Sequence, residues 1–197
     1  ADFVAWTGRV FNEPPIVTQL PKFQYVYGGV DVGGPQPSAI ELVGMTASGQ
    51  VYVFGEKYQP RMQLHDLVRA IGEKHVEHRV RQWHVDNEII WRMIRNGGIP
   101  CRPPNKKKDA AGAAASYINS LIERGMFFVH ESCVGLIHEM QTYEYKDVQS
   151  GDEVTFLDKV KINQLDHAID ALRYAVLPLS SAQASQSYGK VIGYSIG

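Results

Sequence analysis

Two different spacings of apolar residues divide this chain into strands and helices. In the first third, stretches rich in Tyr, Val and Phe are separated by short connections, which predicts an antiparallel meander of three strands. These strands are expected over residues 23–31, 38–45 and 51–59. Pro60 ends the meander, and beyond it the apolar positions recur at the spacing of an amphipathic helix.

Helices and short extended segments alternate in the rest of the chain. Helices are predicted over residues 62–79, 87–98, 105–125, 132–143 and 163–176, with strands over 82–86 and 99–103 and a brief extended segment over 126–130. Asn87 is a typical capping residue, and Pro178 is expected to stop the last helix. A strand that follows a helix tends to lie parallel to its predecessor, so the order predicts an α/β fold with a mixed five-stranded sheet flanked by helices.

Three segments are expected to lie outside this sheet. Residues 1–22 contain three prolines and no clear period, which is typical of a linker or an arm lying on the domain. Residues 143–161 have strand-like flanks around a polar turn and predict an appended β-hairpin. Residues 179–197 are rich in Ser and Gln and predict a flexible tail. The domain itself would span 23–178, excised from the middle of a longer protein.

Composition narrows the class of protein. The 197-residue chain has no apolar run long enough to cross a membrane. Two cysteines, Cys101 and Cys133, are too few for a disulfide framework and lack the spacing of a zinc site, so both are expected in the core. The net charge is only −1, but residues 61–108 hold eleven basic and five acidic residues. A basic middle with acidic flanks fits a polyanion groove beside a carboxylate site, although a solvated helix face would look the same.

Two aspartates end buried strands. Asp31 closes the run "YVYGGVD" and Asp86 closes "QWHVD". If these two strands lie side by side and parallel, their carboxyl ends bring both aspartates to a topological switch point, where open α/β sheets bind ligands. A buried carboxylate is costly without a cation, so a cation is expected at this point.

The last helix carries further acidic residues. Asp166 and Asp170 are four positions apart on one flank, with His167 and Arg173 nearby. Together with Asp31 and Asp86 they would form a carboxylate cluster that favours Mg²⁺ or Mn²⁺, and paired ions about 3.5–4 Å apart are the common apparatus for phosphodiester hydrolysis.

Each of these residues also has a purely structural interpretation. Asp31 could serve the turn that follows it, and Asp86 could cap the next helix. Asp166 lies three residues after Asn163, a spacing that resembles a capping box. Asp170 has no capping role open to it, although it could pair with Arg173.

Basic residues near the predicted third helix are candidates for contacting DNA. Lys106, Lys107 and Lys108 lie at a helix N-terminus, where positive charge opposes the macrodipole and an external phosphate would relieve it. A solvated loop is the alternative. Arg102 and Arg173 are counted with these lysines as candidate DNA contacts.

Three motifs taken together carry a resemblance to a known family. "GVDVG", "HVDNE" and "LDHAIDALRYAV" resemble the nuclease domain of the large terminase subunit, the DNA-packaging motor of tailed double-stranded DNA bacteriophages. The resemblance implies a ribonuclease H-like fold and a metal-dependent endonuclease that cuts concatemeric DNA at the initiation and termination of packaging. Asp31, Asp86 and Asp170 would be its acidic residues, with Asp166 and His167 in the same motif.

The resemblance also implies partners. The family's full subunit carries an ATPase domain, which this chain lacks, and acts with a small subunit and the portal in the host cytoplasm. Two alternatives stay open: a Holliday-junction resolvase or transposase of the same superfamily, and a non-catalytic module that docks on DNA or the portal.

Overall fold

The computed structural model describes residues 8–104, 106, 110–150, 153–160 and 164–192. The elements are β1 (Ile16–Val17), β2 (Tyr25–Asp31), β3 (Pro37–Met45), β4 (Val51–Pro60), α1 (Leu64–His78), β5 (Gln82–Val85), α2 (Glu88–Asn96), β6 (Cys101–Arg102), α3 (Ala110–Glu123), β7 (Phe127–His130), α4 (Val134–Thr142), β8 (Tyr145–Ser150), β9 (Glu153–Val160) and α5 (His167–Ile192). Every strand and helix predicted from the sequence is present, with ends shifted by a few residues.

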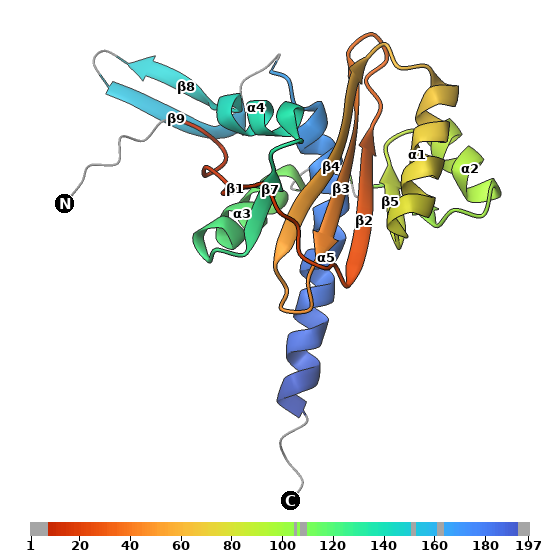
Figure 1. The fold of residues 1–197 in the computed structure, drawn as a ribbon. Coiled ribbons are helices and arrows are strands. Elements are labelled where there is room, and N and C mark those ends of the chain that lie inside the picture. Colours follow the sequence, from red (N-terminus) through yellow and green to blue (C-terminus); the bar gives the residue numbers. More distant parts are fainter. Residues whose placement is uncertain (1–7, 105, 107–109, 151–152, 161–163, 193–197) are drawn as a thin grey trace, which may run out of the picture.

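A mixed sheet forms the centre of the molecule (Figure 1). Its strand order is β1-β7-β4-β3-β2-β5-β6, with β2, β3 and β4 antiparallel and the other pairs parallel. The predicted mixed α/β sheet is therefore confirmed, but the number of five strands is wrong, because the described sheet has seven. The two additional strands are the predicted extended segment, which becomes β7, and β1, a two-residue strand too short to show any period.

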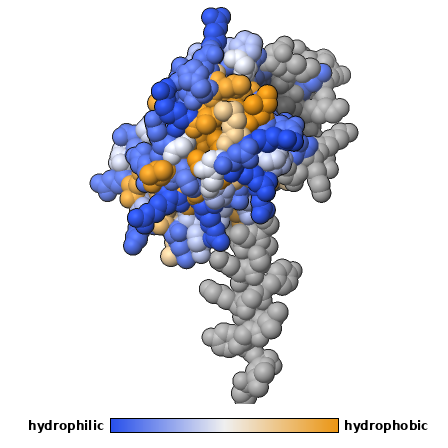
Figure 2. Space-filling model, turned by 90° about the vertical axis from the view of Figure 1, so that its right-hand side faces the viewer, coloured by the Kyte–Doolittle hydropathy of each residue, from blue (hydrophilic) through white to orange (hydrophobic). Residues whose placement is uncertain are grey.

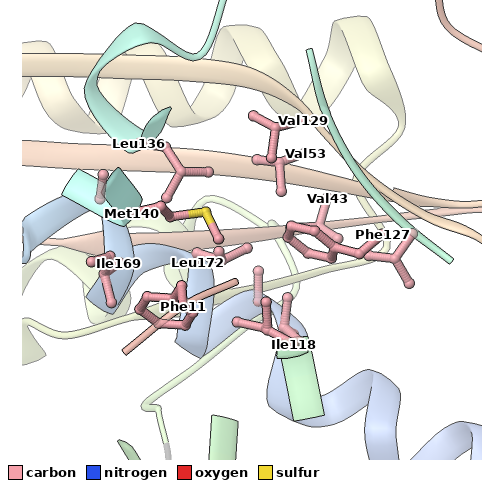
Figure 3. Packing of buried hydrophobic residues seen from close by; sticks show 14 of the residues in the cluster. Phe11, Val43, Val53, Ile118, Phe127, Val129, Leu136, Met140, Ile169 and Leu172 are labelled. Atoms are coloured by element: carbon pink, nitrogen blue, oxygen red, sulfur yellow. The ribbon is translucent and has the colours of Figure 1, made fainter. Parts of the chain in front are cut away.

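Helices cover both faces of the sheet. Alternate residues of β3 point to opposite faces: Ala39 and Val43 join one core, while Ile40 and Leu42 join the other. The first core lies against α3, α4 and α5, and Figure 3 shows its packing around Phe127. The second core lies against α1 and α2. Figure 2 views the side on which these two helices lie in Figure 1, where an apolar patch is surrounded by hydrophilic residues.

The last helix is longer than predicted. The expectation that Pro178 stops it is wrong, because α5 continues through Pro178 to Ile192. A proline removes one helical hydrogen bond and crowds the preceding turn. Here Val176 and Leu179, on either side of the proline, are both fully buried in the first core, so the helix is held against the sheet across this point. The backbone of the predicted tail is thus helical as far as residue 192, and Figure 1 shows this part running past the sheet.

The arm and the hairpin also take part in the fold. Val10 and Phe11 of the arm are buried in the first core, and β1 extends the sheet. The predicted hairpin is confirmed as β8 and β9, which form a separate two-stranded sheet. Across the described part of the chain, none of the helices combines the length and the apolar character needed to span a membrane.

Candidate active site

The carboxyl ends of β2 and β5 lie next to each other. The two strands are parallel, with Gly29 opposite His84 and Val30 opposite Val85. The N–H of Asp86 donates to the carbonyl of Val30 at 3.0 Å, which continues the pairing past the end of β5. This register brings Asp31 and Asp86 to one edge of the sheet, as the strand order predicted.

Asp31 is held by a histidine from the last helix. Its carboxylate is 8% exposed, and its Oδ2 lies 2.7 Å from Nδ1 of His167. Nε2 of the same ring lies 2.7 Å from Oε1 of Gln36. Burial raises the pKa of Asp31, the His167 contact opposes this, and the nearby charges of Asp86 and Asp166 raise the pKa further.

The turn after Asp31 is held by other groups. The N–H of Gly33 donates to Oγ of Ser38 at 3.2 Å, and the N–H of Gln36 donates to the carbonyl of Gly33 at 3.1 Å. The turn interpretation of Asp31 therefore loses its support, because the contacts that its carboxylate makes are with the side chain of His167 on α5.

Asp86 is also released from its structural alternative. The cap of α2 is Asn87, whose Oδ1 accepts a hydrogen bond from the N–H of Ile90 at 3.1 Å. The carboxylate of Asp86 instead forms an ion pair with Lys106 and accepts a hydrogen bond from the hydroxyl of Tyr174 at 3.2 Å.

Asp170 lies in the first turn of α5 and is shared between two neighbours. Its Oδ2 is 3.2 Å from Nη2 of Arg173 and 3.4 Å from the hydroxyl of Tyr174. Burial raises the pKa of Asp170 to about 6, Arg173 opposes the rise, and the negative charges of Asp166 and Asp31 add to it. A carboxylate whose pKa is raised in this way has an incentive to bind a further cation.

Asp166 immediately precedes α5. Its carbonyl accepts a hydrogen bond from the N–H of Asp170 at 2.7 Å, which is the position of an N-cap residue rather than the third position of a capping box. Asn163, the other half of the predicted box, lies outside the described residues. The charge of Asp166 raises the pKa of both Asp31 and Asp170, so it belongs electrostatically to the same cluster.

These four aspartates fit a divalent cation by their chemistry, since hard carboxylate oxygens are what Mg²⁺ and Mn²⁺ prefer. Within the described residues, no three His, Cys, Asp or Glu side chains form a ready-made metal-binding group. Protein cations hold the carboxylates instead: Lys106 pairs with Asp86 and Arg173 with Asp170. A metal ion would therefore have to compete with these pairs.

The candidate DNA contacts fall into three groups. Lys106 and Arg102 are exposed, on the same side of the sheet edge as Asp86 and β6. Arg173 is only 17% exposed and faces Asp170, so its observed role is inside the carboxylate cluster. Lys107 and Lys108 lie outside the described residues. DNA contact by any of these residues stays a prediction.

Tyr174 is the functional candidate that the sequence analysis missed. It is 3% exposed, and its hydroxyl lies between the carboxylates of Asp86 and Asp170. Burial raises the pKa of this hydroxyl, as do the two carboxylates, so it remains protonated and able to donate. The available signal was its position four residues after Asp170, which places both on one face of the helix.

The fold and the position of the acidic cluster define a class of protein: a ribonuclease H-like nuclease domain. The nuclease domain of the large terminase of bacteriophage SPP1, solved with bound Mn, superposes with a TM-score of 0.68 at 16% identity, covering 85% of this chain and 97% of that one. The full-length large terminase of a thermophilic bacteriophage gives a TM-score of 0.67 at 17% identity, covering 84% of this chain and 42% of that one.

A sequence relative points to the same family. The large terminase subunit of Escherichia phage T5 is 25% identical over 199 residues, which is 91% of this chain and 44% of the relative. No family model matches the chain. The chain is thus similar to the nuclease domain of phage large terminase subunits, which confirms the predicted resemblance, and it spans less than half the length of the curated relative.

Proposed function

We propose that this chain is a metal-dependent DNA endonuclease that cuts concatemeric viral double-stranded DNA at the initiation and termination of genome packaging. The observation that carries the proposal is the meeting of Asp31, Asp86 and Asp170 at the carboxyl ends of β2 and β5. The similarity to the SPP1 nuclease domain with bound Mn supports a divalent cation at this place.

Asp31, Asp86 and Asp170 would hold the metal, with Asp166 as a further ligand. Divalent ions there, two in our proposal, would supply neutralisation of the phosphate charge and acidify an attacking water. Asp31 and Asp86 come from the rigid sheet, whereas Asp166 and Asp170 come from the start of α5. The site would thus be assembled from two bodies whose relative placement matters.

The remaining side chains of the site have roles that do not depend on how many ions bind. His167 lies between Asp31 and Gln36, which fixes its ring and lets it orient a water or a phosphate oxygen. Lys106 is 59% exposed, so it can leave Asp86 and turn its ammonium group toward a DNA phosphate. Arg173 is more confined and would continue to offset the charge of Asp170.

The wider assembly is part of the proposal. This chain matches less than half of the large terminase from the thermophilic bacteriophage, a protein also solved in complex with ADP, which supports an ATPase domain outside the matched region. We therefore expect the nuclease to act beside such a domain, with the small terminase subunit and the portal as partners. The place of action would be the host cytoplasm, transiently at the procapsid portal.

The test is cleavage of supercoiled plasmid in EDTA, Mg²⁺ or Mn²⁺ by the wild type, by Asp31→Asn and by Asp66→Asn. Asp66 is a matched control because it lies in the first turn of α1 and pairs with Arg69. We expect metal-dependent cutting by the wild type and by Asp66→Asn, and none by Asp31→Asn. Cutting by Asp31→Asn equal to that of the wild type would refute the site.

The same experiment separates the alternatives. A strong preference for a synthetic four-way junction over linear duplex would favour a junction resolvase. Metal-independent DNA binding without cutting, unchanged in Asp31→Asn, would favour a docking module.

A further inference from the structure

A buried glutamate that is not a candidate ligand contacts the helix that carries half of the site. Glu139 lies on α4 and is 1% exposed. Its Oε2 accepts a hydrogen bond from the N–H of Ile169 at 3.0 Å. Ile169 lies in the first turn of α5, directly between His167 and Asp170 in the sequence, so this contact is made at the point where α5 enters the candidate active site.

The chemistry of this contact suits an anchor. The first N–H groups of a helix have no partner within the helix, and a carboxylate at that end also complements the helix dipole. A hydrogen bond to a charged acceptor in a buried place is stronger and more directional than an exposed one. The first turn of α5 is therefore tied to α4 through a single side chain.

Glu139 is itself tied to the sheet. Its Oε1 accepts a hydrogen bond from the hydroxyl of Tyr58, on β4, at 2.8 Å. Two residues earlier on β4, the carboxylate of Glu56 accepts hydrogen bonds from the N–H groups of Gly135 and Leu136 at 2.9 and 2.7 Å. The first turn of α4 and the turn that holds Glu139 are thus both fixed to the same strand.

The closeness of α4 to β4 makes this connection rigid. A Cβ atom built on Gly135 would lie 2.9 Å from the Tyr58 ring and 3.0 Å from the Glu56 carboxylate, which is tighter than ordinary contact. The path from the sheet to the site therefore runs from β4 through α4 to the first turn of α5. At each step it consists of hydrogen bonds to a buried or half-buried glutamate.

We propose that Glu139 is a positioning residue, which anchors the first turn of α5 and thereby sets the place of His167 and Asp170 relative to Asp31 and Asp86. This inference rests on the proposed nuclease function for its consequence, but the anchoring itself does not. Residues that orient ligands from behind typically change metal affinity by about 10–100-fold when they are removed.

The test compares three substitutions in the 197-residue chain. Glu139→Ala removes both contacts. Glu139→Gln keeps an oxygen for the N–H of Ile169 and an amide that the Tyr58 hydroxyl can accept from, so it should rescue the anchor. Ile94→Val, in the second core on the other face of the sheet, controls for general loss of stability. Tyr58→Phe is the fallback if Glu139→Ala does not fold, because it frees Glu139 from β4 alone.

Two measurements are made on each variant: hydrogen exchange of the amides of residues 168–170, and Mn²⁺ affinity by calorimetry. We expect Glu139→Ala to exchange these amides about tenfold faster and to bind Mn²⁺ about tenfold more weakly, with Glu139→Gln and Ile94→Val near the wild type. Changes in Glu139→Ala no larger than in Ile94→Val would overturn the proposal. A wild type that binds no Mn²⁺, with faster exchange in Glu139→Ala, would support the anchor and overturn the proposed function instead.

Discussion

Gly29 offers the sharpest test of how the site is assembled. It lies on β2 two residues before Asp31, and a Cβ atom built there would be 1.8 Å from the carbonyl oxygen of Ala171 and 3.0 Å from the N–H nitrogen of Ala175. Both are backbone atoms of α5, which no rotamer change can move. Ordinary contact begins at 3.4 Å, so Gly29→Ala requires α5 to retreat by about 1.6 Å.

That retreat has consequences for stability and for the site. Overpacking of this kind costs about 1–3 kcal/mol, which corresponds to a fall in Tm of about 3–10 °C for a chain of this size. The 2.7 Å contact between His167 and Asp31 would not survive a shift of this size. A misplacement of about 1 Å can reduce a rate about 100-fold, so we expect a loss of that order in plasmid cleavage.

The matched control is Gly72→Ala, a second glycine-to-alanine change. Gly72 lies inside α1, and a Cβ atom there meets nothing within 4 Å. This variant should gain about 0.5–1 kcal/mol, because alanine favours helix. Thermal melting and plasmid cleavage are measured for both variants. A Gly29→Ala protein that melts and cuts like the wild type would refute the reasoning.

Three further predictions concern charged groups. Burial raises the pKa of Glu41 well above its ordinary value, so its neutral form stabilises the fold at low pH and this contribution is lost as the pH rises; Glu41→Gln should therefore gain stability over the wild type by about 1–3 kcal/mol at pH 8 and by less at pH 5. Urea unfolding at both pH values measures this, and parallel curves would contradict it. The pKa of Asp170 is raised to about 6, so Mn²⁺ affinity should fall about tenfold per pH unit below 6 as protons compete with the metal; equal affinities by calorimetry at pH 5 and 7 would exclude this. Lys106→Gln should change stability by less than about 1 kcal/mol and reduce the salt dependence of DNA binding by about one ion, whereas an unchanged salt slope would remove Lys106 from the DNA interface.

Local chemistry in the sequence predicted a large part of the fold. The cap of α2 by Asn87 and the hairpin of β8 and β9 depend on residues close to each other in the chain, so both could be anticipated. The meeting of Asp31 and Asp86 followed from strand ends and the parallel order alone. By contrast, β1 has only two residues and owes its existence to pairing with β7, which lies more than 100 residues later.

What held each carboxylate could not be predicted in the same way. The partners of Asp31 and Asp86 are His167, Lys106 and Tyr174, which come from distant segments and meet only because α5 lies on β2. The continuation of α5 through Pro178 likewise depended on burial against the sheet, which outweighs the local cost of the proline.

The sequence by itself determined the order of strands and helices, the acidic residues at the strand ends and on the last helix, and the resemblance to terminase nucleases, because these depend on spacing and residue type along the chain. Only the tertiary structure decided which cations and hydroxyls hold the carboxylates, and that Glu139 ties α5 to α4. Those contacts join residues from separate elements, and their geometry is fixed by how closely the helices pack on the sheet, which no local pattern encodes.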